Sequence, residues 1–136
     1  MTMSIKPIML KLSSDPRNIA LVESFVERAA EQYKIDPDIY GNILITLTEA
    51  VNNAIIHGNC KDESKTVQIQ LRKKRDALAV SVSDEGCGFD LNAIPDPTCP
   101  ENILQVGGRG VFLMQQLCDA VQFQNNGATV EMEFKL

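Results

Sequence analysis

Two pairs of alternating apolar runs, each joined by a short polar turn, constrain the fold of this chain most. The first pair alternates over 67–71 and 78–82, and the second over 121–123 and 130–136 around an Asn126-Gly127 turn. Alternation with a period of two is typical of strands that bury one face. Asn-Gly between such runs is a strong hairpin signal. The sequence therefore predicts two antiparallel hairpins.

Two helices are predicted ahead of the hairpins, each by a capping aspartate followed by proline. Asp15-Pro16 and Asp36-Pro37 both combine an N-cap with the residue favoured at the first helical position. We expect the second helix to run to about His57, with Gly58 as its C-terminal cap. Its core stripe would hold Leu44, Leu47, Val51, Ala54 and Ile55, and that of the first helix Val22, Phe25, Val26, Ala29 and Tyr33.

Hairpins with helices interposed predict an α+β fold. We expect a two-layer sandwich with the helices on one face of a mixed, mostly antiparallel sheet. A Rossmann fold needs repeated strand-helix-strand crossovers, which this order of elements lacks. The 136 residues suit a single domain over 1–136. The segment 86–110 contains three prolines and is long for a connection in a compact domain, which favours a functional or a mobile loop. Residues 110–117 are predicted to form a further helix.

Charge and composition narrow the class of function. The net charge of −5 disfavours nucleic-acid binding, which needs a basic surface. No apolar run approaches the length of a membrane helix, and the N-terminus lacks the pattern of a signal peptide, so we expect a cytoplasmic protein. The four cysteines form no C-x-x-C pair and the chain has one histidine, which favours reduced thiols over a zinc site.

Three constellations carry potential chemistry. Glu49, Asn53 and His57 recur every four residues at the end of the second helix, so a carboxylate and an amide oxygen one turn apart could converge on magnesium. The alternative is a solvated helix face. Asp84, at the end of a strand and followed by Gly86 and Gly88, could accept a hydrogen bond from the exocyclic amine of a purine. The alternative is an ordinary turn.

The third constellation is Gly107-Gly108-Arg109-Gly110 at the start of a predicted helix. Glycines there expose backbone N–H groups to a phosphate. The alternative is a flexible hinge. The pattern matches neither the P-loop nor the dinucleotide fingerprint.

Taken together and in this order, the three segments resemble the ATPase superfamily of Hsp90, gyrase B and sensor histidine kinases. Within it the chain is similar to the anti-sigma-factor serine kinases of bacteria, from about Leu10 to Leu136. Residues 49–58 (EAVNNAIIHG) resemble the N box, 84–88 (DEGCG) the G1 box and 108–110 (GRG) the G2 box. Thr129 resembles the strand threonine that helps to hold adenine.

This resemblance implies a role for each site residue and implies the histidine kinase-like (Bergerat) fold. Asn53 would ligate Mg²⁺, and Glu49 would be the catalytic general base toward a serine hydroxyl. Asp84 would bind the adenine amine, Thr129 would assist it, and residues 89–107 would form an ATP lid. The remaining nucleotide-binding positions would be His57, Gly86, Gly88, Gly108, Arg109, Gly110 and Val111, of which His57 could instead fix the helix end.

The resemblance implies ATP and Mg²⁺ as cofactors, and a sigma factor and an anti-sigma-factor antagonist as partners. The protein would phosphorylate the antagonist on serine and sequester the sigma factor, with a homodimer as an option. Val106 stands where the best-known kinases of this group carry an arginine near the terminal phosphate. That departure favours an alternative, a nucleotide-gated protein-binding module with little or no kinase turnover. A generic α/β domain that binds no nucleotide is a third hypothesis.

Overall fold

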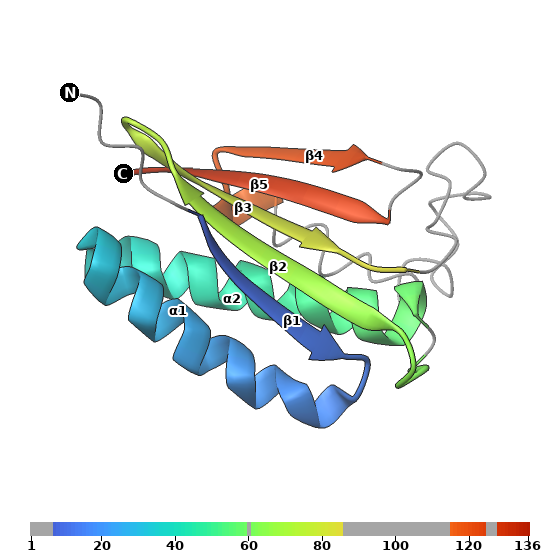
Figure 1. Ribbon diagram of the computed structural model, residues 1–136. Coiled ribbons are helices and arrows are strands. Elements are labelled where there is room, and N and C mark those ends of the chain that lie inside the picture. Colours follow the sequence, from blue (N-terminus) through green and yellow to red (C-terminus); the bar gives the residue numbers. More distant parts are fainter. Residues whose placement is uncertain (1–6, 60, 86–114, 125–127) are drawn as a thin grey trace.

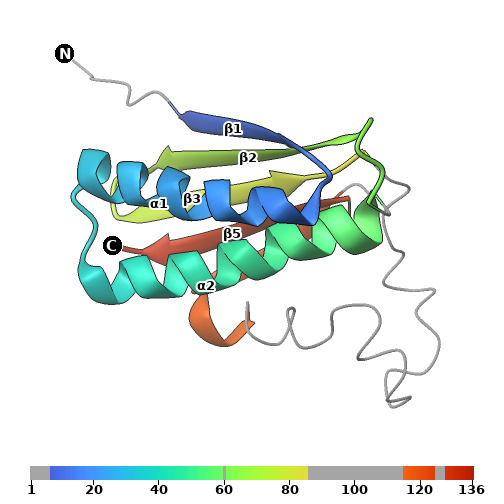
Figure 2. The same cartoon turned by 90° about the horizontal axis from the view of Figure 1, so that it is seen from below.

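The computed structural model of the protein describes residues 7–59, 61–85, 115–124 and 128–136. Two helices lie on one face of a five-stranded sheet (Figures 1 and 2). The strands are β1 (Ile8–Ser13), β2 (Thr66–Lys73), β3 (Ala77–Ser83), β4 (Ala120–Gln124) and β5 (Thr129–Lys135), in the spatial order β1-β2-β3-β5-β4. This arrangement confirms the predicted two-layer α+β sandwich.

All strand pairs in the described residues are antiparallel, whereas we expected a mixed, mostly antiparallel sheet. The reason lies in the position of β5. The β4–β5 hairpin places β5 next to β3, so β4, which runs in the same direction as β3, is separated from it by one strand. Both predicted hairpins are present, with Leu71 opposite Val80 in one and Phe123 opposite Val130 in the other.

The core lies between the helices and the inward face of the sheet. Helix α1 (Ile19–Tyr33) buries all five residues of its predicted stripe. Helix α2 (Pro37–Asn53) buries Leu47 and Val51 as expected, but Ile43 is fully buried where Leu44 is only partly so. The largest fully buried side chains are Phe25, Ile43, Leu47, Ile55, Ile69, Leu71, Leu78 and Met132. Each contributes roughly 1.5–3 kcal/mol through burial.

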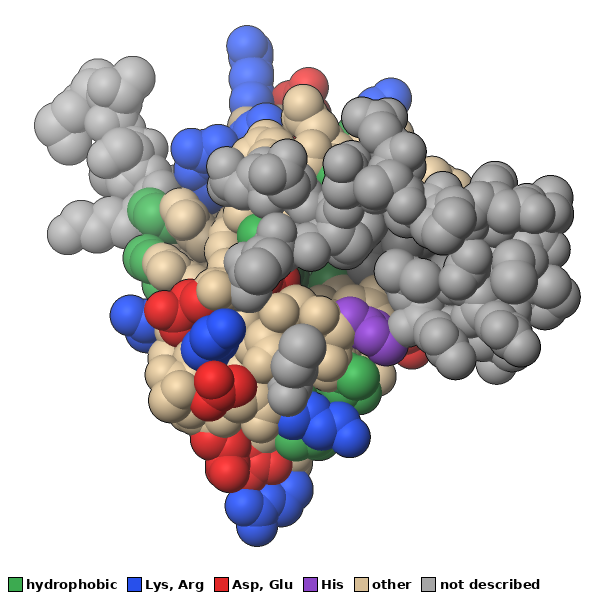
Figure 3. Space-filling view, turned by 90° about the vertical axis from the view of Figure 1, so that its right-hand side faces the viewer, with side chains coloured by type: hydrophobic (Ala, Val, Ile, Leu, Met, Phe, Trp, Pro, Cys, Tyr) green, Lys and Arg blue, Asp and Glu red, His purple; other side chains and the backbone are tan. Residues whose placement is uncertain are grey.

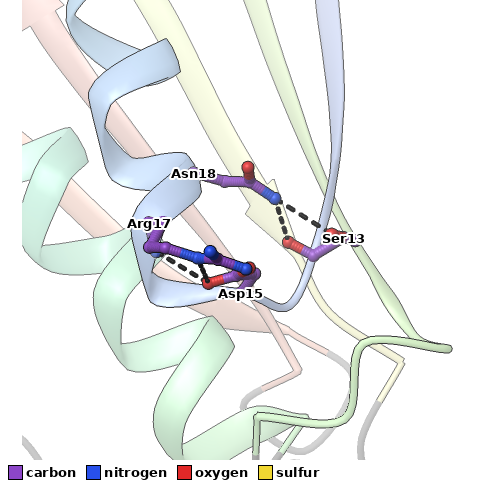
Figure 4. Close-up of polar contacts among 4 residues, drawn as sticks. All are labelled: Ser13, Asp15, Arg17 and Asn18. Atoms are coloured by element: carbon purple, nitrogen blue, oxygen red, sulfur yellow. Dashed lines mark hydrogen bonds and ion pairs between the residues drawn. The ribbon is translucent and has the colours of Figure 1, made fainter.

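The corner between β1 and α1 is fixed by side chains that bond to nearby backbone (Figure 4). Asp15 accepts a hydrogen bond from the Arg17 N–H at 2.9 Å and pairs with its guanidinium at 2.6 Å. The Asn18 amide donates to the Ser13 carbonyl at 2.9 Å and to its hydroxyl at 3.0 Å. Asp15 caps a short 3-10 turn, Pro16–Asn18, so α1 begins slightly later than its predicted start.

The end of α2 differs from the prediction. The helix continues beyond Asn53 as one π turn, Ala54–Gly58, in which the Asn59 N–H donates to the Ala54 carbonyl at 2.8 Å. The residue that caps this turn is Asn59, with right-handed backbone. Gly58 is therefore not the left-handed cap that we expected, and the left-handed position after the helix is occupied by Lys61. The role of Gly58 lies in a tertiary contact instead.

Candidate functional site

The last turns of α2 carry the first predicted constellation. Glu49 and Asn53 lie one turn apart, and both side chains are partly buried at the margin of the helix layer. His57 is exposed. The π turn rotates the chain less per residue than an α-helix does, so His57 does not continue the straight four-residue row that the sequence suggested. Glu49 and Asn53 thus keep the predicted separation of one helical turn, whereas His57 does not extend it.

The π turn brings Gly58 against Asp84, which follows directly after β3. A Cβ added to Gly58 would lie 2.8 Å from Asp84 Oδ1, and closer still to the other two atoms of the carboxyl group. Only a residue without a side chain leaves room for this carboxylate. Two predicted segments, separated by 26 residues in the chain, therefore meet: the end of the N-box helix and the aspartate of the G1 box.

Backbone pairing fixes Asp84 relative to β5. The Asp84 N–H donates to the Ala128 carbonyl at 2.9 Å. One residue earlier, Ser83 lies opposite Thr129, and their hydroxyl oxygens are 3.0 Å apart. Asp84 and Thr129, predicted to act together on one base, therefore lie at the same end of two adjacent strands.

A buried polar network behind Asp84 was not predicted. Asn59, 1% exposed, donates to the Ser14 hydroxyl at 2.7 Å and to the Thr66 carbonyl at 3.0 Å, and accepts from the Glu85 N–H at 2.8 Å. Ser14, also buried, donates to the Lys65 carbonyl at 2.8 Å. An asparagine directly after His57-Gly58 was the available signal, but nothing in its spacing pointed to partners on three other segments of the chain.

Glu85 is held on its other side by Thr66. Its carboxylate accepts hydrogen bonds from the Thr66 backbone N–H and from the Thr66 hydroxyl, the latter at 2.9 Å. These bonds, the backbone one first, hold the pKa of Glu85 below its usual range. Glu85 is thus anchored as an ion at the start of β2.

Several predicted positions lie outside the described residues. These are the ATP lid at 89–107 with Val106, and Gly86, Gly88, Gly108, Arg109, Gly110 and Val111. Of the helix predicted over 110–117, Gln115, Gln116 and Leu117 are described and are helical. Figure 3 views the end of the molecule where α2 and β3 finish, and on its described part acidic and basic side chains are interspersed.

The described groups suit a purine nucleotide and magnesium by the chemistry of their donors. Glu49 and Asn53 offer a carboxylate and an amide oxygen one turn apart, and magnesium usually takes one or two protein oxygens while phosphates and water complete its shell. Asp84 offers a carboxylate acceptor at the end of a strand, in a position that the glycine of the π turn keeps open. Neither α1 nor α2, nor any other helix in the described ranges, is long and apolar enough to cross a membrane.

Comparison with known proteins decides the family. The sequence pattern of the histidine kinase-like ATPase domain matches residues 12–134. The chain belongs to this family. This ATPase domain is 30% identical over 132 residues to the serine-protein kinase RsbW of Bacillus subtilis strain 168. The matched region covers 92% of the chain and 82% of the relative.

Two further relatives of this ATPase domain carry the same name. RsbW of Bacillus velezensis is 29% identical over 139 residues, covering 97% of the chain and 87% of the relative. RsbW of Listeria innocua is 26% identical over 132 residues, covering 92% and 84%. The similarity extends over most of each protein, so the family resemblance inferred from the three boxes is confirmed.

Proposed function

We propose that this protein is an ATP-dependent protein-serine kinase that acts as an anti-sigma factor. It would phosphorylate an anti-sigma-factor antagonist on serine and sequester a sigma factor in the cytoplasm. The observation that supports this most is the contact between Gly58 and Asp84, since it joins the end of the helix that carries Glu49 and Asn53 to the carboxylate assigned to the base. The names of the relatives support the kinase class.

Each described residue has one task in this proposal. Asp84 accepts a hydrogen bond from the adenine amine, and Thr129 assists it. Asn53 is the protein ligand of Mg²⁺, which would offset charge on the phosphate oxygens. Glu49 takes the proton from the serine hydroxyl of the antagonist. The serine oxygen then forms a bond to the γ-phosphorus of ATP, the bond from that phosphorus to the bridging oxygen breaks, and ADP leaves.

Positions outside the described residues complete the proposed site. Gly86 and Gly88 would shape the adenine pocket, and Gly108, Arg109, Gly110 and Val111 would face the phosphates beneath a lid at 89–107. His57 is retained as a nucleotide-binding candidate, with a structural role at the helix end as the alternative. These assignments come from the resemblance of the boxes, and mutagenesis of each position tests them.

Replacing Glu49 by glutamine tests the kinase directly. The amide keeps the size of the side chain but cannot accept the serine proton. We expect ATP affinity within about twofold of wild type, and phosphate transfer to the antagonist reduced by about 10²–10⁴-fold, the usual effect of a positioned general base. Radiolabelled phosphate incorporation measures the rate. Unchanged transfer in this variant would remove Glu49 from the role.

A second function is favoured by Val106, which stands where the resemblance of the G2 box to the best-known kinases of this group implies an arginine. Without that charge near the terminal phosphate, the protein would act as a nucleotide-gated binding module, in which ATP changes a partner surface and little turnover follows. Prolonged incubation with Mg-ATP and the antagonist separates the two functions. Phosphoserine on the antagonist supports the kinase, whereas ATP-dependent binding with neither ADP nor phosphoprotein supports the module.

A further inference from the structure

The buried side chain of Asn59 connects four separate parts of the chain. It lies directly after the π turn and contacts the β1–α1 corner at Ser14, the start of β2 at Thr66 and the residue after Asp84. An asparagine amide combines two donor hydrogens with an acceptor oxygen, and here the donors and the acceptor are all used. Because the side chain is 1% exposed, water cannot replace these partners.

The contact with Glu85 is the one that reaches the proposed base-reading group. Asp84 is held through its own N–H by Ala128, and the next peptide is held through the Glu85 N–H by Asn59 Oδ1 at 2.8 Å. Both peptide groups that flank the Asp84 Cα are therefore fixed. Without the second bond, Glu85 is held through its carboxylate at Thr66 but no longer through its peptide N–H, so the orientation of the Asp84 side chain beside Gly58 is less tightly set.

We infer that Asn59 is a positioning residue for purine recognition, which holds the Asp84 carboxylate toward the exocyclic amine of the base. This inference rests on the proposed function, because it assumes that Asp84 reads the base. It adds a residue outside the three boxes that sets base specificity without touching the nucleotide. A merely structural asparagine would lower stability and weaken all nucleotides alike, whereas a positioning residue alters the preference among them.

The test compares two nucleotides that differ only at the amine. ATP and purine riboside 5′-triphosphate, which carries hydrogen in place of the amine, are titrated by calorimetry into the full-length protein with Mg²⁺. In the wild type we expect the amine to improve the Kd by roughly 10- to 100-fold, the effect of one charge-assisted hydrogen bond. Asp84→Asn should bring this ratio close to one. Asn59→Ala should lower it at least fivefold.

Two variants separate positioning from stability. Asn59→Asp keeps an acceptor for the Glu85 N–H but loses the donors to Ser14 and to the Thr66 carbonyl, so it should lower Tm while retaining most of the wild-type ratio. Thr46→Ala removes a buried hydroxyl that donates to the Asn42 carbonyl within α2 at 2.8 Å, and should lower Tm while leaving the ratio unchanged. If Asn59→Ala does not fold, Asn59→Ser is measured in its place, since its hydroxyl is too short to replace the amide.

The outcomes separate the positioning role of Asn59 from the proposed reading of the base by Asp84. A lowered ratio in the Asn59 variant, with a normal ratio in Thr46→Ala, supports the positioning role. A wild-type ratio in folded Asn59→Ala overturns that role and leaves the proposed nucleotide site intact. A ratio near one in the wild-type protein refutes base reading by Asp84, and the positioning role with it.

Discussion

Replacing Gly58 by alanine tests the contact on which the proposed nucleotide site depends. The new Cβ would lie 2.8 Å from Asp84 Oδ1 and nearer to two other carboxyl atoms. Real Cβ atoms essentially never come within 3.0 Å of another atom in this way, so something must move. Asp84 cannot yield by moving its backbone, because the Ala128 carbonyl and Asn59 hold the peptides on both sides. The carboxylate must therefore turn away from its present position.

The magnitude follows from the bond that is lost. A hydrogen bond to a charged group is worth about 1.5–3 kcal/mol, so ATP should bind roughly 10- to 100-fold more weakly to Gly58→Ala. Backbone strain would add little, since Gly58 does not have left-handed backbone and alanine is the better helix former. Calorimetric titration with Mg-ATP measures the Kd, and circular dichroism verifies that the variant is folded.

Gly41 provides the matched control. It lies in α2, the helix that continues into the π turn of Gly58, and a Cβ added at Gly41 would meet nothing within 4 Å. Gly41→Ala should raise the free energy of unfolding by up to about 1 kcal/mol and leave the ATP affinity unchanged. Wild-type affinity in folded Gly58→Ala would refute the argument that this glycine keeps open the position of a base-reading carboxylate.

Two further predictions concern titratable groups away from this contact. Hydrogen bonds and the charge of Arg17 lower the pKa of Asp15 to about 2, so this carboxylate stabilises the fold above its unfolded pKa of about 4 and loses that effect as pH falls to about 2. In Asp15→Asn the Tm should therefore fall less between these pH values than in the wild type, and equal acid sensitivity would contradict this. Burial raises the pKa of the Cys118 thiol from 9.0 to about 11, so at pH 8 iodoacetamide should modify it about 100-fold more slowly in the native than in the unfolded protein. Peptide mapping by mass spectrometry measures both rates, and equal rates would show that the thiol is accessible as thiolate.

The layers of the fold could be predicted because their signals are local. Alternation over 67–71 and 78–82 predicts strands whose apolar residues share a face, and the structure buries those residues against the helices. The buried stripe of α1 could be predicted in the same way, because its apolar residues recur at helical spacing. Burial of an apolar face dominates the choice of such elements, and the sequence displays that face directly.

The end of α2 could not be predicted because distant partners decide it. Gly58 reads as a helix cap by local rules, yet it serves to admit Asp84 from another element. Asn59 reads as a polar residue in a loop, yet it is buried with partners on β2, after β3 and at the β1–α1 corner. The resemblance of the boxes named Glu49, Asn53 and Asp84 as a set, but only the fold explains how the last of these reaches the helix.

The π turn makes the site sensitive to the count of residues at the end of α2. Five residues from Ala54 to Gly58 occupy a wider loop of backbone than an ordinary helical turn, and this sets the angle at which Gly58 meets Asp84. Each residue of an α-helix turns the chain by about 100°. Deleting or inserting a single residue between Asn53 and Gly58 would point a different part of the helix at the carboxylate, so we expect any change in the length of this segment to disturb the site, whichever residue is added or removed.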